Sequence, residues 1–530
     1  MGEKDILKFC IEKGLLVDSE VLNLFKEETD TDSVKLILER IQKHTSSRII
    51  TKKVFVQNKE KVMEFFSSLP GSDQKNLEGL KIKLGLSIEI SREEVKPAFS
   101  EKSGERILNI GDTITRQEEG GVRVLTMDCQ PGKKFGVEDF LKYYRNRFIG
   151  LKNILQENPA LENLVSINKL SGIRQGVSLI GMVIDKKTTK NKNILLEIED
   201  LTGVVKVLVN NSKEELCKKA EEIALDSVIG FKCSGNREIL FVNEIVFPDA
   251  LLLERKKSPV EEYALFIGDL QAGSHKFMKS NFLKFIDYLN GKVPNTPEVD
   301  KIKYLFILGD LVSGIGAYPD HEKDLAIGDL EAQFNFVAEL LGKIRKDIKI
   351  IITPGNHEGV RLMEPQPLYN EKYSWKLYGM ENVTLAENPV WVNIAARKGF
   401  PGFNVLVYHG FSYPYYANNV PSLMKEKAMN APEKIMAYLL KHRHLAPTNG
   451  SVQYFPSEKD VHLIKEIPDI VASGHTHKAA VAFYNNILLI SCASWEALTP
   501  YQEKFGNQID FCKVPMVNLK TGVIKMLDFE

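Results

Sequence analysis

The chain has 530 residues, of which 43% are hydrophobic. A chain of this length favours two to four domains, each with an ordinary globular core. Lys plus Arg and Asp plus Glu both number 70, so the formal net charge is zero. This balance argues against a histone-like basic coat for nucleic acid, although a local basic groove remains compatible with it.

The sequence predicts a protein that is neither embedded in a membrane nor secreted. No apolar run approaches the roughly 18 residues that a membrane span needs, and the start MGEKDILKFC is charged where a signal peptide is apolar. The six cysteines are scattered without a CxxC pair, so neither a structural zinc site nor a disulfide framework is expected. We therefore expect a reduced, cytoplasmic protein.

The first 70 residues predict a small helical module. Apolar residues recur at helical spacing over 5–26, where Gly14 interrupts the pattern, and again over 34–41. We interpret residues 1–70 as a module that docks a partner. Residues 71–139 mix charges, glycine pairs and short alternations such as Val122–Val124, which predicts a linker with some strand.

Residues 140–250 predict a helix followed by a β-barrel. The helix, FLKYYRNRFIGLKNIL (140–155), either packs as an amphipathic helix or contacts nucleic acid backbone through its basic residues. From Val165 to Phe247, five short strands with a helix after the third give the order of an OB-fold. OB-folds often bind single strands through aromatic and basic residues, but these strands are poor in exposed aromatics, which favours a scaffolding barrel.

Residues 260–530 alternate apolar strands with helical segments, which predicts an α/β domain. The strands are short, look buried and end on polar residues, where an open α/β sheet gathers its functional groups. They lie in the segments YALFIGD, KYLFILGD, KIIITPGNH, FNVLVYHG, DIVASGHTH and ILLISCAS.

Five of these strand ends carry residues that bind metals, and four of the ten histidines lie there. The residues are Asp269 with Gln271, Asp310, Asn356 with His357, His409, and His475 with His477. Each motif alone also has a structural explanation, since Asp caps turns and a lone His is often a hydrogen-bonded core residue. The succession in one chain is what favours a site, and we expect the glycines before Asp310, Asn356 and His475 to let the backbone turn sharply.

The ligand types indicate the metals and the chemistry. Mixed histidine, carboxylate and amide ligands suit Mn, Fe, Zn or Mg rather than copper or an iron–sulfur cluster. A bridging carboxylate fits two ions about 3.5–4 Å apart, an arrangement that clamps a phosphodiester and activates water.

The succession GD, GD, GNHE, H and GHTH resembles the calcineurin-like metallophosphoesterase superfamily, which implies a β-sandwich flanked by helices. The preceding barrel, together with AYPDHEKDL (317–325), PGNHEGVRLMEPQP, LLKHRHLAP (439–447) and VPMVNLKTG, resembles the small subunit of archaeal family D DNA polymerase. This resemblance covers residues 140–530 well. It implies a manganese-dependent 3′–5′ exonuclease that proofreads for a separate large subunit, in which polymerisation resides.

The resemblance also implies a role for each site residue. Asp269, Gln271 and His477 would bind one metal; Asp310 would bridge both; Asn356, His409 and His475 would bind the second; and His357 would contact the scissile phosphate or protonate the leaving 3′-oxygen. The implied cofactors are two divalent ions, Mn²⁺ with Mg²⁺ as the alternative. The implied partners are the large catalytic subunit in a heterodimer and the single-stranded 3′ end of DNA, with a sliding clamp or primase left open.

Gln271 departs from the family pattern, which has a histidine at this position. An amide oxygen is a weaker and harder donor than imidazole, and it suits Mg or Mn better than Zn. We expect the site to assemble with reduced affinity for the first metal and a stronger demand for Mn. The alternative is a catalytically weak or silent scaffold subunit, like the eukaryotic relatives that have lost these ligands. His275 lies four residues after Gln271 in the sequence. It either approaches the site or lies on the surface, and we favour the surface position.

Four basic residues are candidates for guiding a DNA strand, or alternatively for solvated surface or contacts with the large subunit. They are Arg361, Lys441, Arg443 and His444. No Walker loop or polymerase motif is visible, so polymerisation would belong to the partner. A third hypothesis, a stand-alone phosphodiesterase for a small nucleotide, leaves the barrel and the N-terminal module without a purpose.

Overall fold

A computed structural model of the chain describes residues 120–125, 134–457, 459–499, 503 and 508–530, together with a few residues between 8 and 50. The chain divides into two compact units, residues 1–112 and 113–530. In the first unit, strand β1 (Leu16–Val17) pairs in parallel with β2 (Ile49–Ile50), and residues 8–10 are helical. Most of the helical segments predicted over 5–26 and 34–41 lie outside the described residues, so the helical module stays a prediction.

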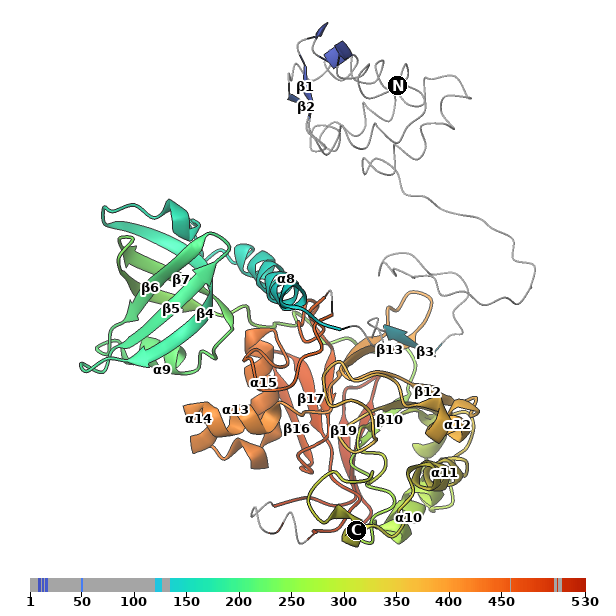
Figure 1. The fold of residues 1–530 in the computed structure, drawn as a ribbon. Helices are drawn as coiled ribbons and strands as arrows, with labels where there is room; N and C mark the ends of the chain where they lie inside the picture. The colour runs from blue at the N-terminus through green and yellow to red at the C-terminus, as the bar shows by residue number, and fades with distance from the viewer. Residues whose placement is uncertain are drawn as a thin grey trace. The chain divides into compact units, whose positions relative to one another are not determined.

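The second unit begins, after a short strand described below, with a long helix and a closed five-stranded barrel (Figure 1). The strand order is β4-β5-β6-β8-β7, with antiparallel pairing except between β6 and β8, which are parallel. A helix lies between the third and fourth barrel strands, as the sequence predicts, while the assignment to the OB-fold stays a prediction. The elements are β4 (Gln175–Thr188), β5 (Ile194–Asp200), β6 (Gly203–Val209), α9 (Glu214–Glu221), β7 (Val228–Gly235) and β8 (Leu240–Val246).

The barrel core follows from period-two alternation, because successive side chains of a strand point to opposite faces. In β5, Ile194, Leu196 and Ile198 are buried and the residues between them are partly exposed. The inward residues of the other strands join them in one apolar cluster.

Two six-stranded sheets form the rest of the unit. The first has the order β12-β11-β10-β9-β18-β19 and the second the order β16-β17-β15-β14-β13-β3. The first sheet contains β9 (Tyr263–Ile267), β10 (Ile302–Leu308), β11 (Lys349–Thr353), β12 (Val383–Leu385), β18 (Lys513–Asn518) and β19 (Ile524–Asp528). The second contains β3 (Gly121–Leu125), β13 (Val390–Ala396), β14 (Phe403–Val407), β15 (Ile470–Ser473), β16 (Ala480–Tyr484) and β17 (Ile487–Ser491).

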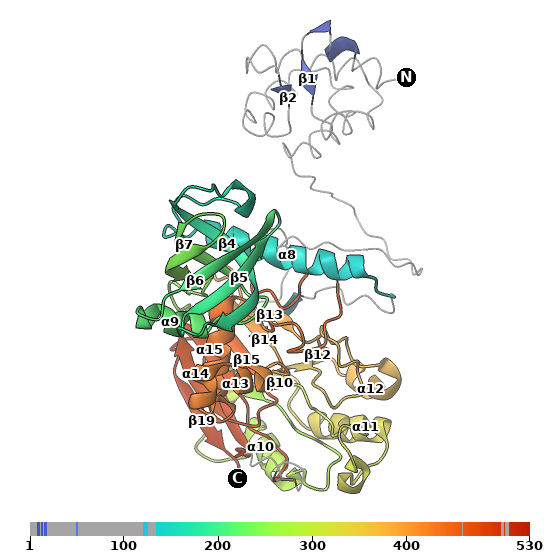
Figure 2. The same ribbon diagram turned by 60° about the vertical axis from the view of Figure 1, so that its left-hand side comes forward.

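The sheets face each other across an apolar core, and helices cover both outer faces (Figure 2). Phe266 of β9 and Phe306 of β10 stack at 4.9 Å in the core between the sheets. Strands such as β9 and β17 are buried at every position, because both of their faces are covered. The covering helices are α10 (Lys279–Leu289), α11 (Leu330–Leu341) and α12 (Glu371–Tyr378) on the first sheet, and α13 (Tyr413–Asn419), α14 (Pro421–Lys425) and α15 (Pro432–His442) on the second.

Strand β3 is the strand expected within the linker over 71–139. It pairs antiparallel with β13, so these residues belong to the edge of the second sheet. The rest of that segment is described only from residue 134 onward.

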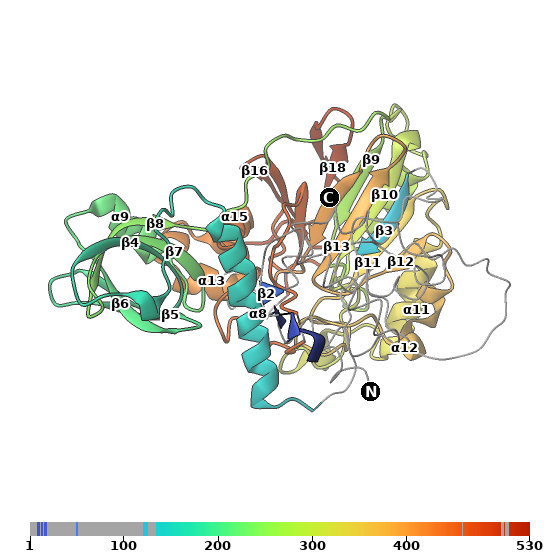
Figure 3. The same ribbon diagram turned by 90° about the horizontal axis from the view of Figure 1, so that it is seen from above.

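Helix α8 (Val137–Gln156) lies between the barrel and the two sheets (Figure 3). Phe148, Leu151 and Leu155 pack on barrel residues, and Arg147 is fully buried. The Arg147 guanidinium donates to Asp460 Oδ2 at 2.7 Å and to the Pro447 carbonyl at 2.5 Å. These contacts favour the packed helix over a nucleic acid contact for this face. None of the helices in the described part of the chain is both long enough and apolar enough to cross a membrane.

Candidate metal centre

The candidate ligands converge where five strands end, at the edge shared by the two sheets. Asp269 follows β9, Asp310 follows β10 and Asn356 follows β11, while His409 follows β14 and the His475–His477 pair follows β15. Parallel strands end at the same edge of a sheet, so polar residues after buried strands meet in space even when they are far apart in sequence.

Two overlapping groups of side chains could each hold a metal ion. The first is Asp269, Asp310 and His477, the second is Asp310, His409 and His475, and the ligand atoms within each group lie within 4.8 Å of one another. Asp310 belongs to both groups, which fits a carboxylate that bridges two ions.

Two amide side chains complete the surroundings. Asn356 Oδ1 lies 3.1 Å from His409 Nε2, beside the second group. Gln271 is 2% exposed, and its Nε2 donates to Asp310 Oδ2 at 3.0 Å. The structure thus brings together all the residues predicted as ligands, although their role as ligands stays a prediction. For its oxygen to serve as a ligand beside Asp310, the Gln271 amide must turn over.

The donor set fits divalent cations. Asp269 and Asp310 are 0% and 2% exposed, and buried carboxylates need a positive partner. Burial opposes the charged form of Asp310, but His357 and His409 hold the pKa of its carboxyl below its usual range. A buried pair of carboxylates faced by imidazoles and amide oxygens is the mixed nitrogen and oxygen set that suits Mn, Fe, Zn or Mg.

The hydrogen bonds of two histidines fix which ring nitrogen faces the site. His409 Nδ1 lies 2.8 Å from the Leu308 carbonyl and His357 Nδ1 lies 2.7 Å from the Ser313 carbonyl. Because a carbonyl only accepts, each Nδ1 carries a proton, and the Nε2 of the neutral ring has a free lone pair. His409 Nε2 then faces Asp310 Oδ1 at 3.5 Å, and His357 Nε2 lies 3.7 Å from Asp310 Oδ2.

Five of the site residues have left-handed backbone conformations. They are Asp269, Gln271, Asp310, His475 and His477, with φ of 50°, 52°, 49°, 67° and 55°. This conformation costs roughly 1–2 kcal/mol for a residue with a Cβ. Such strain gathers at functional sites, where the surrounding structure holds it in place.

Two different physical reasons explain why glycine occupies the three positions that precede candidate ligands. Gly309 has φ of 87°, as the expectation of a sharp turn requires. Gly355 and Gly474 lack a left-handed φ, so that expectation was wrong for them. A Cβ on Gly355 would lie 2.3 Å from Asp310 Oδ1, and one on Gly474 would lie 2.6 Å from Asp269 Oδ2. These glycines are needed because the carboxylates lie against the backbone.

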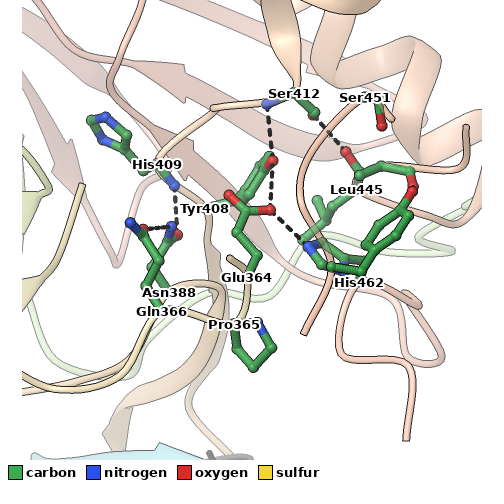
Figure 4. A network of polar contacts seen from close by, with 12 residues as sticks. Glu364, Pro365, Gln366, Asn388, Tyr408, His409, Ser412, Leu445, Ser451 and His462 are labelled. Atoms are coloured by element: carbon green, nitrogen blue, oxygen red, sulfur yellow. Dashed lines mark hydrogen bonds and ion pairs between the residues drawn. The ribbon is translucent and has the colours of Figure 1, made fainter. Parts of the chain in front are cut away.

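A buried polar network supports the ligand loops (Figure 4). The His409 backbone N–H donates to Asn388 Oδ1 at 2.8 Å, Asn388 donates to Gln366 Oε1 at 2.6 Å, and Gln366 donates to the Gly355 carbonyl at 2.7 Å. This chain joins the loop after β14 to the loop after β11. Beside it, Glu364 accepts from the Tyr408 hydroxyl at 3.2 Å and lies 2.7 Å from His462 Nε2.

Glu358 also joins two ligand loops, a role that the sequence analysis missed. Its buried carboxyl accepts from the backbone N–H groups of Leu311 and Gly355, at 2.5 and 2.8 Å. Burial, and then the charge of Asp310, raise the pKa of Glu358 to about 8. The sequence feature that could have identified Glu358 is its position as the last residue of the GNHE motif.

A cavity of about 850 Å³ opens above the candidate ligands. This volume lies in the range of pockets that take small ligands. Five of the seven candidate ligands line it, namely Gln271, Asp310, Asn356, His475 and His477. Other lining residues come from the loop after β10 and from α13, α14 and the following 3₁₀ turn (Ala428–Asn430). Residues on the walls that the sequence analysis did not single out include Ser313, Tyr318, His321, Asn418, Met424 and Met429.

The four basic candidates for guiding DNA are not brought together with the metal centre. Arg443 and His444 are 4% and 1% exposed; Arg443 donates to the Ile464 carbonyl at 2.6 Å, and His444 Nε2 lies 2.8 Å from Asp460 Oδ2. Their prediction as strand guides is corrected, because they have almost no surface to offer.

The other two candidates are also engaged with protein groups. Lys441 pairs with Glu222 and lies 4.4 Å from the Phe247 ring centroid. Arg361 is half-buried, with its guanidinium 3.5 Å from the Phe455 ring centroid. His275 is exposed and does not line the cavity, as the surface interpretation expects.

Comparisons with known proteins identify the family. Residues 264–479 match the calcineurin-like phosphoesterases. The DNA polymerase II small subunit of Pyrococcus furiosus is 37% identical over 403 residues, which cover 74% of this chain and 64% of that protein. That of Methanothermobacter thermautotrophicus is 36% identical over 398 residues, which cover 74% of this chain and 80% of that protein. The chain belongs to the family of archaeal DNA polymerase II small subunits.

The resemblance inferred from the sequence motifs is thereby confirmed. The chain spans a little less than two thirds of the length of the Pyrococcus small subunit, 64%. A solved archaeal phosphodiesterase matches with 11% identity and a TM-score of 0.24, covering 50% of this chain and 98% of that protein. The match of residues 264–479 to the calcineurin-like phosphoesterases implies divalent metal ions, for which the two groups around Asp310 could provide ligands.

Proposed function

We propose that the chain is a polymerase small subunit with a two-metal phosphodiesterase site that removes nucleotides from the 3′ end of DNA. The observation that supports this most is the pair of ligand groups that share Asp310, a residue that lines a cavity of about 850 Å³. The family name supports a large partner subunit that carries out polymerisation in a heterodimer.

The first metal would be held by Asp269, Gln271, Asp310 and His477, and the second by Asp310, Asn356, His409 and His475. Bound there, two divalent cations supply an activated water and neutralise the charge of the phosphodiester. We propose Mn²⁺, with Mg²⁺ as the alternative, because the set mixes imidazole nitrogens with carboxylate and amide oxygens.

His357 would serve as the general acid. Its Nδ1–H is held by the Ser313 carbonyl, so Nε2 is the nitrogen that faces the cavity and carries the proton to be transferred. In the imidazolium form, Nε2 donates this proton to the leaving 3′-oxygen as the P–O bond breaks. The His357 backbone N–H also donates to Asp310 Oδ1 at 3.1 Å, which orients that carboxylate.

The substrate would be a single-stranded 3′ end. An unpaired end reaches a recessed site without melting, whereas a paired end must first be unstacked and separated. The domain boundaries that we propose are 1–70 for a docking module, 71–139 for a linker, 140–250 for an OB-fold and 260–530 for the nuclease. A sliding clamp or primase at the docking module remains a hypothesis.

A silent scaffold subunit is the second candidate, and Gln271 is the observation that favours it. Its amide N–H donates to Asp310, which is the contact of a residue that holds a carboxylate rather than one that binds a metal. Absence of Mn²⁺ binding by the wild-type protein would support the scaffold.

The test is degradation of 5′-labelled single-stranded DNA by the full chain with added Mn²⁺, alone and with the large subunit. We expect a ladder shortened from the 3′ end. Cleavage should fall by about 100-fold or more in His357→Ala, as is usual when a general acid is lost, and at least as far in Asp310→Ala, which removes the shared ligand of both ions. His275→Ala, which removes an exposed histidine close in sequence, is the control and should cleave like wild type. Equal cleavage by wild type and both site variants would contradict the proposed function.

A further inference from the structure

A buried serine and histidine on the wall of the cavity form a hydrogen-bond chain that the proposed mechanism does not use. The Ala317 backbone N–H donates to His321 Nδ1 at 3.2 Å, and His321 Nε2 lies 3.1 Å from Ser313 Oγ. Ser313 and His321 are 2% and 1% exposed, and both line the cavity.

The direction of this chain follows from what each group can do. A backbone N–H only donates, so His321 Nδ1 accepts and carries no proton. The neutral imidazole then has its proton on Nε2, which donates to Ser313 Oγ. Burial, together with the nearby His357, lowers the pKa of His321, which favours this neutral form. Since Ser313 Oγ accepts from His321, the hydroxyl proton remains available for another partner.

The position of Ser313 is fixed beside the proposed general acid. Its backbone N–H donates to the Ala272 carbonyl at 2.9 Å, and its carbonyl holds His357 Nδ1 at 2.7 Å. The next residue, Gly314, lies so close to His357 that a Cβ would be 1.9 Å from the His357 carbonyl oxygen. The loop after β10 therefore holds the hydroxyl rigidly on the cavity wall next to the acid.

We propose that Ser313 is a substrate-binding residue whose hydroxyl donates to an oxygen of the bound phosphate, and that His321 is the positioning residue that directs it. This inference rests on the proposed function for the identity of the ligand, a nucleotide phosphate at the metal centre. A rigid donor aimed at a charged oxygen is the kind of group that phosphate sites use to orient the ligand.

The experiment measures binding of thymidine 5′-monophosphate to the full chain by calorimetry in excess Mn²⁺, together with KM and kcat for single-stranded DNA. Ser313→Ala removes only the hydroxyl and keeps the carbonyl that holds His357. We expect about tenfold weaker nucleotide binding and a similar rise in KM, as for a lost hydrogen bond to a charged group. Mn²⁺ binding, followed by electron paramagnetic resonance, should be unchanged.

Variants at His321 test the positioning role. His321→Phe cannot donate to Ser313 and should lose binding as Ser313→Ala does. His321→Gln retains a side-chain N–H and should recover most of it. Ser280→Ala, on the exposed face of α10, is the matched control.

The outcomes separate this inference from the proposed function. Wild type that binds the nucleotide but never cleaves DNA contradicts the nuclease while leaving the Ser313 contact standing. Cleavage by wild type, with equal nucleotide binding in Ser313→Ala, overturns the Ser313 contact alone. Absence of nucleotide binding by wild type, or a fall in kcat without a change in binding or KM, also overturns it, because the hydroxyl would then only support His357.

Discussion

Gln271 decides how strongly the candidate centre holds its first metal. The residue is buried and has a left-handed backbone, as Asp269 and Asp310 do, so the loop places it in the geometry of a ligand. What differs is the chemistry, since an amide oxygen binds less strongly than an imidazole nitrogen and its N–H group already contacts Asp310.

Restoring a histidine should therefore strengthen metal binding. In Gln271→His, the Mn²⁺ concentration for half-maximal binding should fall by about tenfold, a typical size for a change in a metal site. The measurement is a titration of the full chain with Mn²⁺, followed by electron paramagnetic resonance, with His275→Ala as the control. An unchanged titration would mean that position 271 does not contact the metal.

At the residue level, the sequence located the candidate ligands, which the structure brings together, better than the residues around them. Asp310 and His409 follow strongly apolar strands, and a polar residue in that position lies at the sheet edge whatever the loops do. Glu358, Ser313 and His321 are positioned by the packing of loops, which the spacing of motifs does not determine. Arg443 and His444 were misjudged because a basic residue in the sequence carries no sign of its burial.

Among the elements, α8 contacts both the barrel and the domain of the two sheets. Its Arg147 pairs with Asp460, which also lies 2.8 Å from His444 Nε2 and accepts from the Tyr143 hydroxyl at 2.8 Å. Burial opposes the charge of Asp460, but His444 and Arg147 hold the pKa of its carboxyl well below the usual range. The ion pair is therefore a charged contact on which the docking of the helix depends.

Removal of Arg147 should destabilise the second unit. Arg147→Ala leaves Asp460 buried without its main cation, which costs about 3–5 kcal/mol. The thermal unfolding midpoint of the full chain should fall clearly, while Arg145→Ala, on the exposed side of the same helix, should stay within about 0.5 kcal/mol of wild type. Equal midpoints for the two variants would show that the ion pair is not needed for docking.

The positions of the strands, and of the helix after the third barrel strand, could be predicted from the sequence. Short apolar runs bounded by turn residues indicate each of these elements without information from the rest of the chain. Strand β3 was not assigned to a sheet, since its pairing with β13 joins residues far apart in sequence. The amphipathic pattern of α8 predicted a helix, but not that one of its arginines is fully buried.

At the scale of the whole molecule, the barrel and the two sheets form one compact unit with the candidate centre on the sheet domain. Direct contacts join them: the Tyr438 hydroxyl donates to the Glu222 carbonyl at 2.9 Å, and the Thr448 hydroxyl donates to the Leu225 carbonyl at 3.1 Å. That a barrel precedes the α/β domain could be predicted from the sequence, whereas these contacts depend on surfaces that only the folded chain brings together.

The measurement that decides most directly between a nuclease centre and a scaffold is the number of Mn²⁺ ions bound per chain. We predict two ions per wild-type chain, with the magnetic coupling of a bridged pair in the electron paramagnetic resonance spectrum. Asp310→Ala, which removes the shared carboxylate, should abolish the coupling and lower the number bound. A wild-type chain that binds no Mn²⁺, or only a single uncoupled ion, would contradict the two-metal centre.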